Sequence, residues 1–455
     1  MQSFGGAERQ MMLFKIAFRN ILRGGRRSLM TASAIAVGAV ALILFGEYKG
    51  MAVIGLETGA VQDTGHLTVF RKGYLDFGSG RPEAYSISDY GALLSLIEND
   101  PELKPMLNVV TPAVSLGGIA SNPAFDRAKT FFATGMVPSD RDKMRRWDEY
   151  RLYTTVRYAP FPMTDKEIDH GVVGKGLARI LGLCKPLKLA GCPAQPEDAA
   201  VSHQSVAAGP PRLDLLSAAG GAPNIVAFYV NKAESRGAKE MDDNYVGMNL
   251  KLAQRLLYGG GEGKVSSIVV QLKRSEDLAP ARARLEALFA AHRLDLEVRD
   301  FKELSPAFNQ ITAALGALFA FVSAILFIIV LFTIANTMGM SVMERTNEIG
   351  TGRAMGVRRS SIRHQFLLEG AILGIAGATA GTALAVALTY GINHAGITYH
   401  MPISTSPIPL YLMDENVGAL RGGIWLVLVL IAVAASLIPA NRAARMKVVD
   451  ALRHV

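Results

Sequence analysis

Two runs of residues in this 455-residue chain have types and spacings that suggest chemistry. Residues 258–266, Tyr-Gly-Gly-Gly-Glu-Gly-Lys-Val-Ser, resemble a phosphate-binding loop, but Tyr258 stands where that motif needs its first glycine and Val265 follows the lysine. His394 and His400 could ligate a metal, yet no carboxylate lies nearer than Asp414. The sequence also lacks the His-Glu-x-x-His and Gly-x-Ser-x-Gly motifs of zinc proteases and hydrolases. We therefore expect a protein that is not an enzyme, with no cofactor or metal of its own.

Cys184 and Cys192 are the only two cysteines, and they begin a segment rich in proline, alanine and glycine. In an oxidising compartment a pair so closely spaced favours a local disulfide. Free thiols are one alternative and a metal site is another. The metal is disfavoured because no histidine lies between the two cysteines, and His203 is eleven residues beyond Cys192.

Long apolar runs surround these residues. No Asp, Glu, Lys or Arg occurs in the 40 residues 304–343 or in the 44 residues 370–413. Because a helix needs about 20 apolar residues to cross a bilayer and must satisfy its backbone groups internally, these runs predict transmembrane helices. The expected spans are 29–46, 314–340, 366–390 and 423–440. Buried helices of a large soluble protein are a poor alternative, because the charges are absent from all four blocks.

The distribution of cations predicts the orientation. Fifteen Lys or Arg residues lie in segments 1–28, 341–365 and 441–455, whereas the connection 391–422 has only Arg421. These three segments are therefore expected in the cytoplasm, and residues 47–313 and 391–422 outside it. The sequence predicts a multi-pass membrane protein, in contact with membrane lipids. The net charge of +9 follows from this topology, so it gives no reason to expect a nucleic-acid partner.

The N-terminal segment 1–28 has apolar and basic residues at helical spacing, with Leu13, Ile16 and Ile21 on the apolar side. This pattern is typical of an amphipathic helix on the inner membrane surface. The sequence continues into Glu47 and Tyr48 without a small-x-small cleavage site. An uncleaved anchor is therefore the expected form.

The outer region 47–313 is long enough for one or two domains. Strand-like stretches alternate with helical ones, which predicts a large α+β domain between the first and second spans. The expected strands are 66–71, 108–114, 130–134, 225–230 and 267–272, and the expected helices are 88–99, 248–258 and 278–292. An insert is expected at about 150–221.

The loop 341–365 and the third span carry two further patterns. In the loop, charged residues alternate with small apolar ones and with glycines, which suits a short helix that inserts apolar side chains into a partner's groove. In the third span, Gly374, Gly377 and Gly381 allow another helix to approach closely. Packing within the chain and a dimer seam are both open interpretations of these glycines.

Several of these stretches resemble the core of FtsX-like permeases, the membrane subunits of mechanotransmission (type VII) ABC systems. The matching residues are Asn20–Leu22, 174–178, 181–183, 336–337, 341–350, 353–357, 366–370, the three glycines of the third span, 438–444 and 450–453. Gly65-His66-Leu67-Thr68-Val69 with Gly73-Tyr74 looks closest to the lipoprotein-releasing LolC and LolE branch, as opposed to MacB. The chain departs from the family where Cys184-Lys185-Pro186 and a proline-rich segment replace a short Gly-Asp turn and strand.

The resemblance implies a permease subunit whose loop docks on ABC ATPase subunits, with ATP and Mg bound by that separate partner, whereas MacB-type chains carry a fused ATPase. The implied docking residues are Glu344, Arg345, Glu348, Ile349, Arg353, Ala354, Met355, Gly356 and Val357. A second permease copy or a paralogue, a periplasmic adaptor and a lipoprotein substrate are further implied partners. The implied function is lipoprotein release or export of an amphipathic substrate. The alternative is an FtsX-like transmitter that regulates a cell-wall hydrolase, and the size of the outer domain favours the first.

Overall fold

The computed structural model describes residues 6–151, 161–189, 192, 209–217, 223–236, 239–259, 263–399 and 408–448. The chain forms two compact units. We call them the helical unit, which comprises Met1–Ile54, Gln310–Ile397 and Leu410–Val455, and the sheet unit, which comprises Gly55–Asn309 and Thr398–Pro409.

Four long helices dominate the helical unit. Among the described residues, four helices are long and apolar enough to cross a membrane: α2 (Gly25–Thr64), α10 (Pro306–Glu344), α12 (Arg359–Ala395) and α13 (Val417–Arg445). Each contains one of the predicted spans and extends beyond it. The predicted fold, one span before and three spans after a large outer domain, is confirmed.

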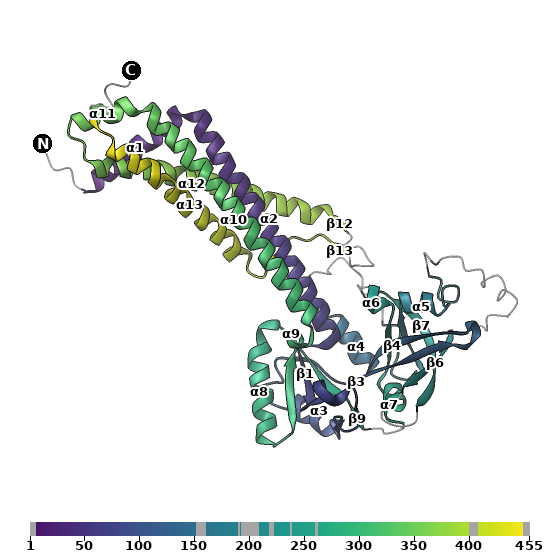
Figure 1. Ribbon diagram of the computed structural model, residues 1–455. Helices are drawn as coiled ribbons and strands as arrows, with labels where there is room; N and C mark the ends of the chain where they lie inside the picture. Colours follow the sequence, from purple (N-terminus) through teal and green to yellow (C-terminus); the bar gives the residue numbers. More distant parts are fainter. Residues whose placement is uncertain are drawn as a thin grey trace. The chain divides into compact units, whose positions relative to one another are not determined.

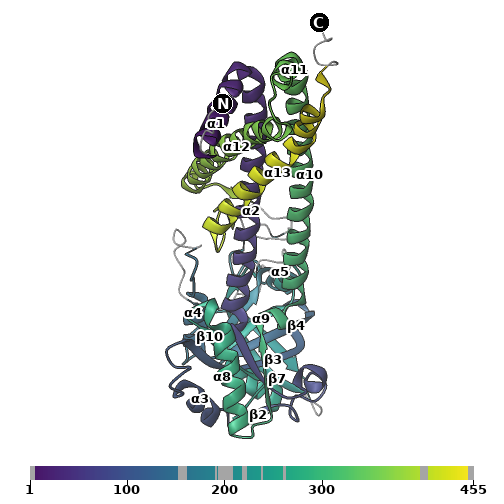
Figure 2. The ribbon, with the colours of Figure 1, turned by 90° about the vertical axis from the view of Figure 1, so that its left-hand side faces the viewer.

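Two shorter helices, α1 (Gly6–Arg23) and α11 (Thr346–Ala354), belong to the same unit. Both lie at the same end of the helical unit (Figures 1 and 2). The N-terminal helix ends at Arg23, earlier than the sequence suggests, because a turn at Gly24 separates it from α2. Residues 25–28 are therefore the first residues of α2.

Small side chains let the long helices pack closely. The buried cluster that joins α2, α10, α12 and α13 contains several alanines among larger aliphatic residues: Ile35, Ala39, Leu42, Ile43, Val330, Ile334, Met338, Leu373, Ala378, Ala385, Ile424, Leu428, Ala432 and Ala435. Because lipid offers no hydrophobic driving force between helices, such close van der Waals packing is a main source of their association.

The sheet unit is built on a nine-stranded mixed sheet, as far as the described residues show it. Its order is β11 (Leu296–Asp300), β1 (Leu67–Arg71), β10 (Ser267–Leu272), β3 (Leu107–Asn122), β4 (Arg127–Met136), β8 (Tyr245–Asn249), β5 (His170–Gly174), β7 (Asn224–Glu234) and β6 (Arg212–Ser217). The last strand, β6, also pairs with the far half of β3. Six strands therefore close into a ring, and β3 is shared between that ring and the open part of the sheet.

Three helices cover one face of this sheet: α3 (Tyr90–Glu98), α7 (Leu250–Tyr258) and α8 (Leu278–Ala291). Their buried side chains form one core with strand residues such as Leu67, Val114 and Val270. Helix α4 (Pro138–Arg145) packs on the other face, where Met144 joins a smaller cluster with Val109, Ala113, Met136 and Val269. The alternation along β3 decides which side chains face each side.

Short elements complete the chain: β2 (Ile87–Ser88) paired with β9 (Lys264–Val265), β12 (Thr398–Tyr399) paired with β13 (Ile408–Pro409), α5 (Lys175–Ile180), α6 (Lys239–Asp242), α9 (Phe301–Leu304), a π-helix at Tyr74–Gly78 and 3-10 turns at Pro123–Phe125 and Ser275–Asp277.

The five expected strands correspond to β1, β3, β4, β7 and β10, and the three expected helices to α3, α7 and α8. The insert expected at about 150–221 needs correction. Strands β5 and β6 lie within that range and pair with β7, β8 and β3 of the main sheet. They are therefore part of the sheet and not of a separate insert. Much of the rest of that range lies outside the described residues.

Candidate functional site: the loop end of the helical unit

The connection between α10 and α12 contains a short helix with a defined stop. Arg345 separates α10 from α11, and α11 ends in a Schellman motif: the Val357 N–H donates to the Gly352 carbonyl at 3.0 Å, and the Gly356 N–H donates to the Arg353 carbonyl at 3.1 Å. Gly356 has a φ of 92°, which a residue with a side chain rarely adopts. The glycine therefore permits the tight reversal that leads into α12.

One face of α11 is anchored in the bundle. Ile349 is 9% exposed and packs in a cluster with Val342, Ile362, Phe366, Ala440 and Ala443. The sequence suggests that Ile349 faces a partner, and this needs correction. Its side chain holds α11 against α10, α12 and α13.

The C-terminal end of α11, by contrast, is exposed. The Met355 side chain is 81% exposed and that of Val357 is 43% exposed, and Ala354 and Gly356 are exposed as well. Arg353 is half-buried, and its Nη1 donates to the Ala444 carbonyl of α13 at 3.5 Å. Residues 354–357, which we call the exposed turn, are thus a small apolar surface held on a fixed base.

Arg345 serves a buried junction. Its Nη1 donates to Glu369 Oε1 at 2.8 Å, and its Nη2 donates to the Asn20 carbonyl at 3.2 Å. Asn20 Nδ2 also donates to Glu369 Oε1 at 2.8 Å. The Glu369 side chain is only 3% exposed. The single carboxylate among the apolar residues of the third span is therefore a structural tie between α1, α12 and the start of α11, and Arg345 is not available to a partner as the sequence suggests.

Two exposed ion pairs add to this junction. Arg23 Nη1 lies 3.1 Å from Glu348 Oε1, and Arg27 contacts Glu344. Exposed pairs of this kind stabilise a protein little, because water and salt screen the attraction. Glu344 and Glu348 thus have partners within the chain. Sequence reasoning missed this, although the spacing of four residues between the two arginines matches the spacing between the two glutamates.

The three glycines of the third span make contacts within the chain. A Cβ added to Gly374 would lie 2.7 Å from the Ala432 Cβ of α13, and one added to Gly377 would lie 2.7 Å from the Ile35 Cβ of α2. A Cβ at Gly381 would lie 2.5 Å from the Ala36 carbonyl oxygen, also of α2. Of the two interpretations, packing inside the chain is the one that the structure supports.

A second polar network lies elsewhere in the same unit. Glu47 of α2 is fully buried, and its Oε1 lies 2.6 Å from the Arg421 guanidinium of α13. Thr389 of α12 donates a hydrogen bond to the other Glu47 oxygen. Arg421 is the lone cation of its segment, which is the signal in the sequence that it needs a partner.

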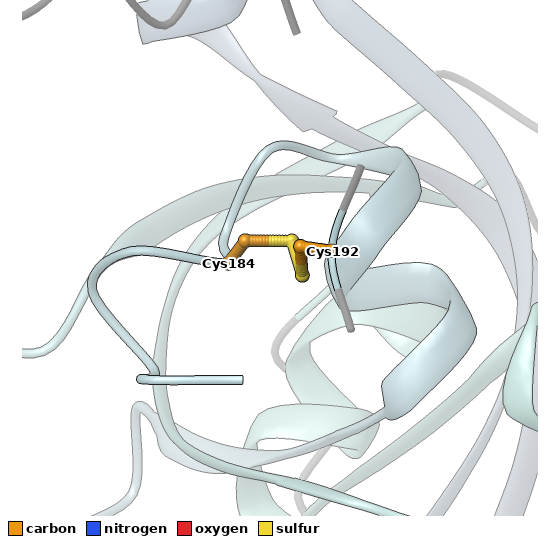
Figure 3. Close-up of a disulfide and its surroundings, with 2 residues drawn as sticks. All are labelled: Cys184 and Cys192. Atoms are coloured by element: carbon orange, nitrogen blue, oxygen red, sulfur yellow. A yellow bond between two sulfur atoms is a disulfide. The ribbon is translucent and has the colours of Figure 1, made fainter. Parts of the chain in front are cut away.

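The two cysteines are joined in a disulfide, the pairing favoured from the sequence (Figure 3). The Cα atoms of Cys184 and Cys192 lie 6.3 Å apart. Leu183, directly before the first cysteine, is 1% exposed and belongs to the core of the sheet unit. The disulfide therefore closes its loop directly beside a residue that is buried in the core.

The remaining candidates for chemistry have structural roles where they are described. Gly259, with a φ of 66°, caps α7, so the glycine run begins as a helix stop. Residues 260–262 and His400 lie outside the described residues. The His394 ring contacts the Tyr390 carbonyl at 2.8 Å. Within the described ranges, no three His, Cys, Asp or Glu side chains are grouped as a metal site would require.

Comparisons with known proteins agree with this arrangement. A family model described as FtsX-like permease C-terminal matches residues 320–448, which run from within α10 to the end of the described chain. The macrolide export ATP-binding/permease protein MacB of Hyphomonas neptunium is 28% identical over 236 residues, covering 51% of this chain and 34% of that protein. MacB of Psychrobacter arcticus is 22% identical over 463 residues, covering 98% of this chain and 60% of that protein.

The periplasmic region of MacB from Actinobacillus actinomycetemcomitans, a crystal structure, shares 11% identity with this chain at a TM-score of 0.32, covering 55% of this chain and 95% of that one. This score is too low to bear on the fold. The chain spans less than two thirds of the length of both curated relatives named above. Both carry the MacB name, so the nearer resemblance to LolC and LolE stays a prediction.

The family match includes the loop 341–365 and most of the last three long helices. Together with the cation distribution, it makes the chain a multi-pass inner-membrane protein with its sheet unit on the periplasmic side. Residues 320–448 thus match the FtsX-like permease C-terminal family, and nearly the whole chain, with its four membrane-crossing helices, is similar to MacB at 22% identity.

Proposed function

We propose that this permease is the membrane subunit of an ATP-driven mechanotransmission system. A separate ABC ATPase binds ATP and Mg, docks on the exposed turn, residues 354–357, and drives the release of lipoproteins or the export of another amphipathic substrate. A second permease copy or a paralogue completes the complex, and a periplasmic adaptor or a lipoprotein meets the sheet unit.

The two-sided character of α11 carries this proposal. Ile349 is buried in a cluster that involves α10, α12 and α13, whereas Met355 is 81% exposed about two turns further along the chain. A solvated loop would need neither the buried anchor nor the exposed methionine. Methionine is flexible and polarisable, and it adapts well to an apolar groove of a partner.

The same anchors offer a path for motion. A force applied to the exposed turn reaches α10 and α12 through Arg345, Glu369 and Ile349 without passing through a flexible loop. Helix α10 has 39 residues, which corresponds to about 60 Å at 1.5 Å per residue. The boundary between the two units falls inside α2 and inside α10. A rigid-body or shear switch is therefore the proposed mode of transmission.

A second copy needs a surface other than the three glycines of the third span. Gly374, Gly377 and Gly381 contact helices of the same chain. Helix α10 instead exposes a stripe of large apolar side chains: Phe321, Ile325, Ile328, Ile329 and Phe332. We propose that a second permease subunit covers part of this stripe, with lipid over the remainder.

The test combines docking with coupling. Met355→Asp places a charge on an exposed side chain, so expression and membrane insertion should be unchanged. Binding of the purified cognate ATPase in lipid nanodiscs should fall roughly thirtyfold, which corresponds to about 2 kcal/mol for an interface anchor. Its stimulated ATP hydrolysis should fall as well. Lys264→Ala, in β9 of the sheet unit, is the control and should change neither.

Full ATPase binding and full stimulation by the Met355→Asp protein would remove the main support for docking at the exposed turn. Normal docking with activation of a cell-wall hydrolase and no movement of a lipidated substrate would favour the transmitter function instead.

A further inference from the structure

A cavity of about 570 Å³ lies in the sheet unit, and the coupling described above makes no use of it. Its floor is one face of the sheet. Five strands that are adjacent in the order β1, β10, β3, β4 and β8 each contribute side chains to it, among them Phe70, Val269, Ala113, Thr134 and Tyr245.

The alternation of side chains along each strand explains why this face of the sheet is left largely uncovered. The neighbouring residues on these strands, such as Val69, Val114 and Val246, point to the opposite face and are fully buried in the main core. On the cavity side, α4 covers only a small cluster around Met144. The four spacings between these five strands, at about 4.8 Å each, give a trough about 19 Å long. Half of a hydrocarbon core that is about 30 Å thick is about 15 Å, so an extended acyl chain from one leaflet fits the length of the trough.

The walls suit a flexible apolar ligand. Met136 and Met163 line the cavity and are buried, and Met241 and Phe132 line it with exposed side chains. Thioethers adapt their shape to irregular apolar surfaces. The volume lies within the roughly 300–1,000 Å³ of small-molecule sites.

A charged cluster lies at one part of the lining. Asp63 forms ion pairs with both Arg141 and Arg236. Arg141 also donates to the carbonyls of Gln62 and Asp63, at 2.7 and 3.1 Å. Two guanidinium groups share one carboxylate, so this part of the cavity keeps one positive charge. The other charged group in the lining, Glu240, is exposed.

Of the two arginines, Arg236 is the one with an unpaired hydrogen-bond donor among the described residues. Its guanidinium lies over the Tyr245 ring at 4.3 Å, and its Nε–H is buried with no acceptor among the described residues. A buried donor without a partner costs stability, and an oxyanion is a suitable acceptor for it.

We propose that the cavity binds one acyl chain of an anionic amphiphile, with the hydrocarbon along the trough and the head group beside Arg236. The inference deepens the proposed function, because it gives an amphipathic substrate a site in the sheet unit. A protein partner is a weaker candidate, since stable protein interfaces bury about 800 Å² on each side and a trough of this size does not offer that.

The experiment uses the full chain in lipid nanodiscs without ATPase, and palmitic acid that carries a diazirine on its chain as the probe. Peptides labelled by light are mapped by mass spectrometry. In the wild type, labels should appear in β4, in β8 or near Met163. Thr134→Trp fills the trough and Met241→Asp charges its exposed edge. Each should lower labelling of these peptides about tenfold, the loss that corresponds to about 1.4 kcal/mol.

Thr130→Trp is the matched control, since Thr130 lies on the same strand and the same face but outside the cavity. It should leave labelling unchanged, and thermal unfolding verifies that all three variants are folded. Labels confined to the helical unit would overturn the proposal, and so would equal labelling of the cavity in the Thr134→Trp and wild-type proteins. Either result would favour a protein partner as the occupant of the cavity. The outcome is separable from the proposed function, because ATPase docking by the Met355→Asp protein is measured independently.

Discussion

Glu369 accepts a hydrogen bond at 2.8 Å from Arg345, and this buried pair joins α12 to the residue that separates α10 from α11. Asn20 donates to the same carboxylate oxygen. Three segments that are distant in sequence therefore meet at one carboxylate. The loop end of the helical unit is thus held by a polar junction as well as by apolar packing.

Removing the carboxylate should loosen this junction. Glu369→Ala leaves the Arg345 guanidinium mostly buried without its counter-charge, and breaking a buried pair typically costs about 3–5 kcal/mol. We expect a clearly lower thermal unfolding temperature for the protein in nanodiscs. Glu348→Gln is the control, because its ion pair with Arg23 is exposed and is worth roughly 0–1 kcal/mol. Equal unfolding temperatures for both variants would show that the buried pair contributes little.

A methyl group at Gly377 should separate two helices. The new Cβ would lie 2.7 Å from the Ile35 Cβ and 2.8 Å from the Ala32 carbonyl oxygen, so α2 and α12 have to move apart. Overpacking of this kind costs about 1–3 kcal/mol. Gly391→Ala is the matched control on the same helix, since no described atom beyond the neighbouring helix backbone lies within 4 Å of the added Cβ, and it should be neutral or stabilising. Thermal unfolding of both variants in nanodiscs decides the matter. An unchanged unfolding temperature for Gly377→Ala would argue against the close contact with α2.

His66 should make the stability of the sheet unit depend on pH. Burial holds the pKa of His66 at about 4, below its ordinary value of 6.5, against an opposing attraction from Asp277. The ring is fully buried, and its Nδ1 accepts a hydrogen bond from the Leu272 N–H at 3.0 Å. Below pH 6.5 the unfolded chain therefore binds a proton that the folded chain does not.

Stability from His66 is present above pH 6.5 and is lost as the pH falls from about 6.5 to about 4, by about 3 kcal/mol in total. We expect the unfolding midpoint of the full chain, followed by tryptophan fluorescence, to fall over this range. His66→Gln should remove most of that slope whatever its effect on absolute stability. The same slope in the variant would assign the pH dependence to other groups.

The disulfide between Cys184 and Cys192 should survive purification. Mass spectrometry of the protein digested without reductant should show the two cysteine peptides linked, and mild reduction should release them. A bridge over a short loop stabilises a protein by roughly 2–3 kcal/mol in the loop-entropy model. Two alkylated cysteines without prior reduction would contradict the pairing. Cys184→Ser/Cys192→Ser is the reference for the effect on stability.

The sequence was sufficient for features that depend on one segment at a time. Charge-free runs predict the four long helices, and β-branched stretches predict β1, β3, β4, β7 and β10. Strands β5 and β8 escaped prediction because each is only five residues long and contains glycine, which is unfavourable in isolated strands. Their pairing with distant strands determines their structure.

Predictions about the loop end were limited for a similar reason. The alternation of charged and apolar residues marked the segment 344–357, but it could not tell Ile349, which faces the bundle, from Met355, which faces outward. That distinction depends in part on Ala440 and Ala443 of α13, which lie more than 90 residues beyond Ile349 in sequence. Complementary spacing, such as Arg23 and Arg27 against Glu344 and Glu348, is a signal that would have helped.

The buried pair between Glu47 and Arg421 has a consequence for how the protein is made. Glu47 follows the first predicted span and Arg421 precedes the last, so the ribosome completes the first charge more than 370 residues before its partner exists. Until α13 enters the membrane, the Glu47 carboxylate has to stay at the water interface, because an unpaired charge in hydrocarbon is costly. The arrival of Arg421 then allows α2, α12 and α13 to close together. A chain cut short before α13 should consequently be retained by membrane quality control.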